Sequence, residues 1–178
     1  PVAIAGLAAA SAGGGPDGAT APLRTLAADP ATLAGFLVFL LVFGPLPEEM
    51  GWRGYALPAI QPRLGALAAA LAIGVVHALW HVPLFLVPGT YQAGLGFGGA
   101  AFWRFLVALL FLSVVATWLF NRTRGSTASA VLLHFADNAA GELTALSPAA
   151  EWLRFALWGA VAAVILAATR GRLGREAG

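Results

Sequence analysis

The sequence predicts an all-α, polytopic transmembrane helical bundle with about five spans. Of its 178 residues, 60% are hydrophobic and only 10% are charged, and the mean hydropathy is +0.82. In soluble domains roughly a quarter of the residues are charged, so this chain has too little polar surface to cover itself in water. Its apolar runs also have the length of about 20 residues that a helix needs to cross a bilayer.

The expected spans follow one another at residues 31–57, 64–87, 101–121, 127–147 and 152–169. Residues 1–30 are expected to hold the tail of an upstream membrane segment and a loop, because the apolar stretch Val2–Ala12 is too short to cross alone. Since the chain also starts without a methionine, we expect a fragment that lacks an N-terminal membrane portion. One membrane core at 31–170 and a basic cytoplasmic tail at 171–178 complete the expected organisation.

All ten basic residues are arginines, and most fall on one side of the five-span arrangement. On that side lie Arg53, Arg63, Arg122, Arg124, Arg170, Arg172 and Arg175, and on the other lie Arg24, Arg104 and Arg154. Because short cytoplasmic loops carry an excess of positive charge, the C-terminus is expected to be cytoplasmic, in a plasma (inner) membrane. These arginines explain the basic pI without a nucleic-acid partner.

Three of the expected spans carry polar residues at membrane depth. These residues are Glu48, Glu49 and Arg53 in the first span, His77 and His81 in the second, and His134 and Asn138 in the fourth. An unpaired carboxylate is costly to take out of water, so such residues are functional candidates by default. Residues four apart share one helix face, and each of the three spans therefore presents a polar face.

The chemistry that fits these polar faces is hydrolysis. A carboxylate beside an imidazole can hold a water molecule and take its proton as general base, a role that suits Glu48 with His81. His134 and Asn138 would donate hydrogen bonds to the oxyanion that forms when the water attacks a carbonyl. The neighbouring arginine would neutralise the second glutamate. The sequence has neither a cysteine nor a G-x-S-x-G pattern, so covalent catalysis has no support.

At its first polar face the chain resembles a family of intramembrane proteases, the CAAX protease and bacteriocin-processing family (CPBP, also called Abi). The first motif of that family, E-E-x-x-x-R, is commonly followed by glycine. It matches Glu48, Glu49, Arg53 and Gly54, and Trp52 supplies the aromatic residue before the arginine.

The second and third family motifs lie on the later polar faces. The second, F-x-x-x-H, is matched only at His81, because His77 stands at the phenylalanine position. The third, H-x-x-x-N, matches His134 and Asn138. The resemblance covers about residues 31–147, and the order of three motifs makes it specific.

The resemblance implies an endopeptidase that hydrolyses a peptide bond of a membrane-associated protein or peptide, either CAAX-type prenylated or bacteriocin-like, within the lipid bilayer. The residues that it implies for catalysis are Glu48, Glu49, Arg53, His81, His134 and Asn138. Two other classes of protein remain open at this point. One is a transporter or channel with a buried path of glutamate, histidine and arginine, and the other is a family member without activity.

Zinc remains an alternative to a mechanism without a cofactor, because members of this family are often labelled metalloproteases. Glu48, His81 and His134 would supply nitrogen and oxygen ligands, and His77 is a less favoured ligand. The zinc-protease pattern H-E-x-x-H is absent, because Ala78 stands where its glutamate would be. We therefore favour the glutamate mechanism, which requires no cofactor.

Four further charged residues are interpreted without a catalytic role. Asp137 and Glu142 lie on the same expected helix as His134, where we expect them to serve a polar network or an interface. Glu151 and Arg154 are expected to form a charge pair at the start of the last span, at the membrane surface.

Overall fold

The computed structural model describes residues 20–174 of the protein. Helices and turns make up this part of the chain, and it holds no strand, which confirms the predicted all-α class. Most of the tail and loop expected within residues 1–30 lies outside the described residues, as does the end of the tail expected at 171–178.

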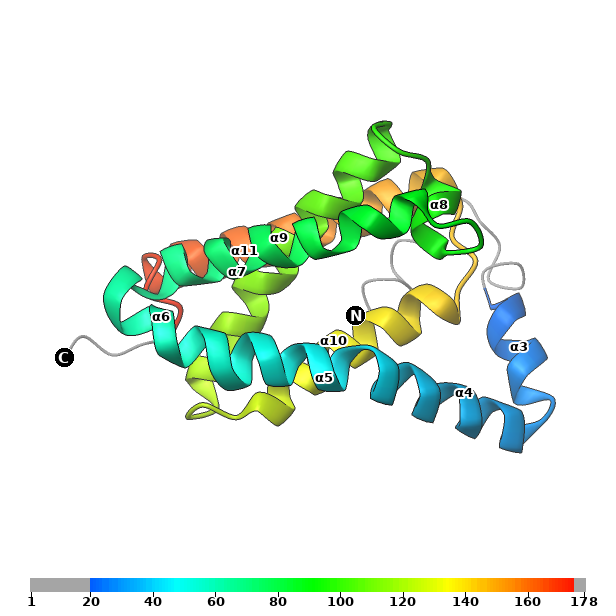
Figure 1. The fold of residues 1–178 in the computed structure, drawn as a ribbon, viewed down its shortest axis with the longest axis horizontal. Coiled ribbons are helices and arrows are strands. Elements are labelled where there is room, and N and C mark those ends of the chain that lie inside the picture. The colour runs from blue at the N-terminus through cyan, green and yellow to red at the C-terminus, as the bar shows by residue number, and fades with distance from the viewer. Residues whose placement is uncertain (1–19, 175–178) are drawn as a thin grey trace.

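The first half of the described chain forms a long, interrupted helical rod followed by a second helix. The elements are α3 (Ala21–Ala27), α4 (Pro30–Phe43), α5 (Pro45–Glu49), the π-helical turn η1 (Met50–Ala56), α6 (Leu57–Leu64), α7 (Ala66–His81) and the 3-10 turn η2 (Val82–Leu86). Asp29 begins the rod by accepting a hydrogen bond from the Ala31 amide, directly before Pro30. At Gly44 and Pro45 the rod bends between α4 and α5 (Figure 1).

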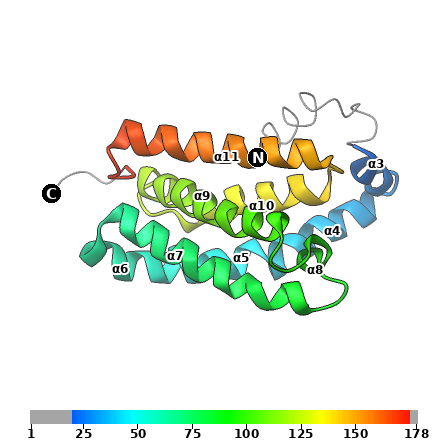
Figure 2. The same ribbon diagram turned by 90° about the horizontal axis from the view of Figure 1, so that it is seen from above.

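The second half contributes four helices. They are α8 (Tyr91–Leu95), α9 (Ala100–Arg122), α10 (Thr127–Glu142) and α11 (Pro148–Thr169). The long α9 is the central helix, because it packs against α7, α10 and α11. Figure 2 shows the resulting layers, with α11 on one side, α9 and α10 in the middle, and α4 to α7 on the other side. Since α10 also contacts α5, it carries its polar face to the glutamates of the first span.

Four stretches among the described residues are long and apolar enough to cross a membrane. They are Pro30–Leu64, Ala66–Leu86, Ala100–Arg122 and Pro148–Thr169. The stretch expected to span at 127–147 forms the shorter α10 instead, with 16 residues ending at Glu142. A new helix starts after residues 143–147, because the Ser147 hydroxyl accepts from the Ala150 amide and Pro148 occupies the first turn of α11.

A glycine sets the spacing between α7 and the central helix. A Cβ atom added at Gly74 would lie 3.0 Å from Ser113 Cβ and 3.2 Å from Leu110 Cα. The Ser113 hydroxyl uses the same close approach to donate a hydrogen bond to the Ala70 carbonyl across 2.7 Å. The missing side chain therefore lets α7 and α9 meet closely enough to share a polar contact in an apolar layer.

We expect Gly74→Val to lower the free energy of unfolding by about 1–3 kcal/mol, because added methyl groups would press on the α9 backbone. Gly35→Val is the matched control, since nothing lies within 4 Å of a Cβ at Gly35. Thermal unfolding in detergent micelles would measure both variants. Equal midpoints for the two variants would contradict the close approach.

Candidate active site

A closed ion pair lies under the first polar face. Arg53 Nη1 donates to both carboxylate oxygens of Glu49, at 2.9 and 3.0 Å, and both side chains are fully buried. Arg53 Nη2 donates to Ser113 Oγ at 2.9 Å, and this contact ties the pair to α9. The expected pairing of Glu49 with Arg53 is confirmed. The arginine neutralises this glutamate and leaves the charge of its neighbour Glu48 without such a partner.

The second polar contact joins α10 to the same buried glutamate. His134 Nδ1 lies 2.9 Å from Glu49 Oε1, and because a carboxylate oxygen only accepts, the ring nitrogen donates. The other nitrogen of a neutral His134, Nε2, then carries a lone pair and lies 4.0 Å from Glu48 Oε2. This separation is too long for a direct hydrogen bond, and one water molecule can contact both atoms across it.

The imidazole that contacts Glu48 is His77, not His81 as expected. His77 Nε2 lies 2.9 Å from Glu48 Oε2, and the His77 side chain is fully buried. His81 is one turn further along α7, where its Nδ1 donates to the His77 carbonyl at 3.0 Å. The pairing of Glu48 with His81 is therefore corrected. Spacing of four residues placed both histidines on one face, and the position of α7 against the first span decides which of them reaches the carboxylate.

The metal-ligand set expected from the sequence changes in the same way. Among the described residues, the donor atoms of Glu48, His77 and His134 lie within 4.8 Å of one another, whereas His81 is not part of this group. One carboxylate oxygen and two imidazole nitrogens are a ligand set that a catalytic zinc ion takes, with the fourth position left for water. The residues therefore fit zinc by type. His77 Nε2 cannot donate to Glu48 and bind a metal at the same time.

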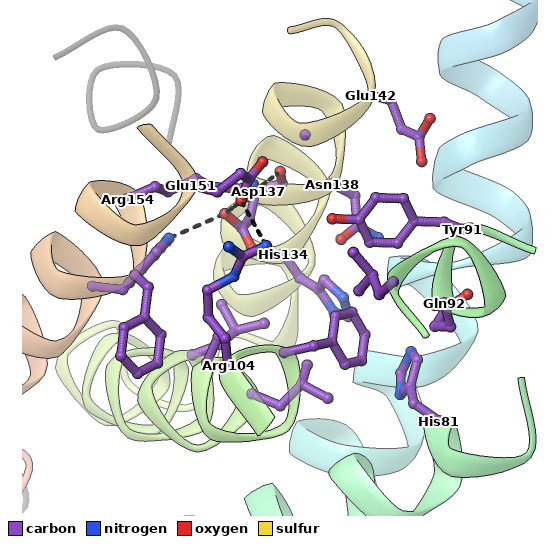
Figure 3. A pocket seen from close by; sticks show the side chains of 18 of the residues that line it. His81, Tyr91, Gln92, Arg104, His134, Asp137, Asn138, Glu142, Glu151 and Arg154 are labelled. Atoms are coloured by element: carbon purple, nitrogen blue, oxygen red, sulfur yellow. Dashed lines mark hydrogen bonds and ion pairs between the residues drawn. The ribbon is translucent and has the colours of Figure 1, made fainter. Parts of the chain in front are cut away.

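A cavity of about 310 Å³ adjoins these histidines. Its walls come from α4, α7, α8, α9, α10 and α11, and they include His81, His134 and Asn138 (Figure 3). Asn138 lies beside the bend in the first span, since a Cβ at Gly44 would be 3.7 Å from Asn138 Nδ2. Glu48 is not among the lining residues, and it lies next to the lining residue His134. Glu49 also contacts His134, and Arg53 lies one contact further from the cavity, behind Glu49.

A group of charged residues lines the side of the cavity away from His81. Arg154 donates to the Asp137 carbonyl at 3.1 Å and to Asp137 Oδ1, which also accepts from Trp158 Nε1 at 3.1 Å. The network role expected for Asp137 is confirmed. Glu151 lies 3.7 Å from Arg104 of α9, so the expected pair of Glu151 with Arg154 is wrong. Both glutamate and arginine find partners on other helices rather than on their own.

Two contributors to this region are absent from the predicted site. Ser113 supports the buried arginine, and Arg104 lines the cavity. They are two of the few polar residues within the apolar span at 101–121, and this contrast with the surrounding sequence is the signal by which they could have been found.

Comparisons with known proteins agree with this geometry. Residues 30–140 match the family model described as type II CAAX prenyl endopeptidase Rce1-like. The chain is also 31% identical over 132 residues to CAAX prenyl protease 2 of Methanococcus maripaludis, an alignment that covers 73% of this chain and 48% of that relative. The chain thus spans about half the length of this curated relative. Together with the four apolar helices, the match indicates an integral membrane protein.

Proposed function

This chain belongs to the Rce1-like family of type II CAAX prenyl endopeptidases, and we propose that it hydrolyses a peptide bond near the C-terminus of a prenylated protein within the membrane. One observation carries this proposal. Two adjacent glutamates have different environments, because Glu49 is sealed against Arg53 whereas Glu48 keeps 23% of its side chain exposed and faces His134 across 4.0 Å. A buried support beside an accessible carboxylate is the arrangement that a water-activating base requires.

In the proposed reaction, a water molecule lies between Glu48 Oε2 and His134 Nε2. Glu48 takes a proton from this water while the oxygen attacks the carbonyl carbon of the substrate. The negative charge that forms on the carbonyl oxygen is stabilised by the Asn138 amide, which lines the cavity. Glu48 then returns the proton to the nitrogen of the leaving peptide as the C–N bond breaks. His81 faces the same cavity, where we assign it a role in holding the substrate.

The two support contacts prevent the catalytic groups from turning away. Glu49 fixes the ring of His134 and keeps its Nε2 directed at the water, as carboxylates do for histidines in other sites. His77 holds the Glu48 carboxylate in the same way from the opposite helix.

We propose that the C-terminus is cytoplasmic and that the protein lies in the plasma (inner) membrane, on the distribution of its arginines.

A reconstitution experiment tests the proposed function. The purified chain in lipid vesicles is given a prenylated peptide that ends in a C-a-a-X sequence, and products are identified by mass spectrometry. We expect cleavage by the wild-type chain and none above background by His134→Ala. Cleavage by both at equal rates would refute the proposal, and proton flux without cleavage would favour a transporter.

The metal question needs a separate measurement on the same protein. We propose that activity requires no bound metal, because Glu48 and His77 already satisfy each other directly. If zinc is used, Glu48, His77 and His134 would hold it, and it would activate the water as a Lewis acid. Elemental analysis of the active protein, followed by assay after chelator treatment, distinguishes the two mechanisms. Loss of activity with the metal, and its return on zinc addition, would overturn the metal-free proposal.

We expect His77→Phe to lower kcat by about 10- to 100-fold, because a hydrogen bond to a charged group contributes about 1.5–3 kcal/mol. This substitution introduces the family's own residue at the motif position. His77→Gln is the matched variant, since an amide N–H can still donate to Glu48, and we expect it to retain more activity. Steady-state kinetics and thermal unfolding would be measured together. A fully active His77→Phe would show that the contact with Glu48 does not matter.

A further inference from the structure

We propose that Arg104 is the binding site for the free C-terminal carboxylate of the substrate. This inference rests on the proposed function, and it adds the group by which the cavity would recognise the end of a peptide. Arg104 lies in the first turns of α9 and lines the same cavity as His134 and Asn138. Figure 3 shows Arg104 on the side of the cavity that carries Glu151 and Arg154, with His81 across from it.

The guanidinium N–H groups of Arg104 have weaker partners than those of Arg154, the other arginine in the cavity wall. Among residues 20–174, its guanidinium makes a 3.7 Å ion pair with Glu151 and stacks on the Trp152 ring, whose centroid is 5.3 Å away. The ion pair is longer than a hydrogen bond. Arg154, in contrast, is held by the backbone and side chain of Asp137. Arg104 is therefore a positioned cation whose planar fork can receive a carboxylate.

The carboxylates around the cavity show which group a substrate would have to displace from Arg104. Its lining carboxylates are Asp137, Glu142 and Glu151. Asp137 is neutralised by Arg154, and Glu142 is exposed at the described end of α10. The remaining carboxylate, Glu151, faces Arg104. A substrate carboxylate would have to compete with Glu151 for the guanidinium. We propose that Glu151 occupies the guanidinium until a peptide end displaces it.

The distance to the catalytic groups suits a short peptide. Arg104 lies nine residues, or about 14 Å of helix, before Ser113, which contacts the support residue Arg53, and it lines the same cavity as the catalytic His134. A C-a-a-X sequence ends in a free carboxylate, and any peptide bond within it lies at most three residues from that end. Three extended residues span about 10 Å, and the long arginine side chain can cover the remainder. A carboxylate site at this position would set how far from its end a peptide is cut.

The test compares two prenylated peptides that differ only at their C-terminus, one with a free carboxylate and one with an amide. We expect the wild-type chain to have a KM for the acid that is about 10- to 100-fold lower than for the amide, the range of one charge-assisted contact. Arg104→Gln should raise the KM for the acid to that for the amide, with kcat nearly unchanged. Arg104→Lys should keep part of the preference. Arg63→Gln, at an exposed arginine on α6, is the matched control and should change nothing.

The Glu151→Gln variant distinguishes two roles of the ion pair between Arg104 and Glu151. If Glu151 competes with the substrate, its removal should lower the KM for the acid peptide. If the ion pair only ties α9 to α11, its removal should lower the unfolding midpoint without improving the KM, which would overturn the proposal.

Binding separates this inference from the proposed function. Dissociation constants of both peptides are measured with labelled forms, so the preference for the acid is visible even if neither peptide is cleaved. Absence of cleavage would then refute the protease proposal alone. Equal binding of acid and amide by the wild-type chain would refute the carboxylate site. A loss in Arg104→Gln that is the same for both peptides would also refute it, and would assign the arginine to a lipid headgroup or to the fold.

Discussion

Glu48→Gln is expected to lower kcat/KM by about 10²- to 10⁴-fold, the range for a lost general base. Glutamine has the shape of glutamate but cannot take a proton from water. Its amide can still contact His77, so the neighbouring helix should keep its place. Because the effect falls on the chemical step, KM should change little while kcat falls.

The control for this prediction is Asp29→Asn, the same carboxylate-to-amide change at an exposed residue that does not line the cavity and whose amide can still cap α4. It should cleave the prenylated peptide at the wild-type rate. Product formation would be followed by mass spectrometry with enzyme in excess, so that a slow variant is still measured. A Glu48→Gln variant as active as Asp29→Asn would remove Glu48 from the mechanism.

Arg53→Met should destabilise the fold by about 3–5 kcal/mol, because it leaves the fully buried Glu49 without its cation. The Ser113 oxygen would also lose the Arg53 donor and keep only its own hydrogen bond to the Ala70 carbonyl. The midpoint of unfolding, measured in mixed micelles, should fall strongly. Activity should be lost as well, since Glu49 would no longer hold His134 in place.

A double variant separates charge from packing in this result. Replacing Glu49 by leucine in the Arg53→Met background removes both charges together, and such replacements are often neutral for stability. We expect Arg53→Met with Glu49→Leu to recover much of the unfolding midpoint but none of the activity, because the His134 ring would lose its acceptor. An unchanged midpoint for Arg53→Met alone would show that the pair contributes nothing to the fold.

The helical class and the polar faces could be predicted from the sequence because both follow from local patterns. Apolar runs of bilayer length predict helices, and spacing of four predicted that Glu49 would meet Arg53. Which side chains pair between helices could not be predicted, because it depends on the rotation and depth of each helix. His77 rather than His81 reaches Glu48 through the packing of α7, a tertiary effect that spacing alone does not determine.

The cavity could be predicted least. It forms between segments far apart in the sequence, and the short helix α8 contributes to its wall although its five residues carry no strong signal. The hydropathy pattern also did not predict where α10 ends, because the apolar composition continues up to Ser147 and Pro148, where a new helix starts. Isolated polar residues such as Arg104 are visible in the sequence, but their partners are not.

The three histidines share one feature that limits how protons can travel. Each has one ring N–H directed at a fixed acceptor: the Glu48 carboxylate for His77, the His77 carbonyl for His81, and the Glu49 carboxylate for His134. These acceptors fix the orientation of each ring, and the second nitrogen of His134 is thereby left facing Glu48 across 4.0 Å. In the proposed reaction the proton taken from the water therefore moves only between Glu48 and the substrate.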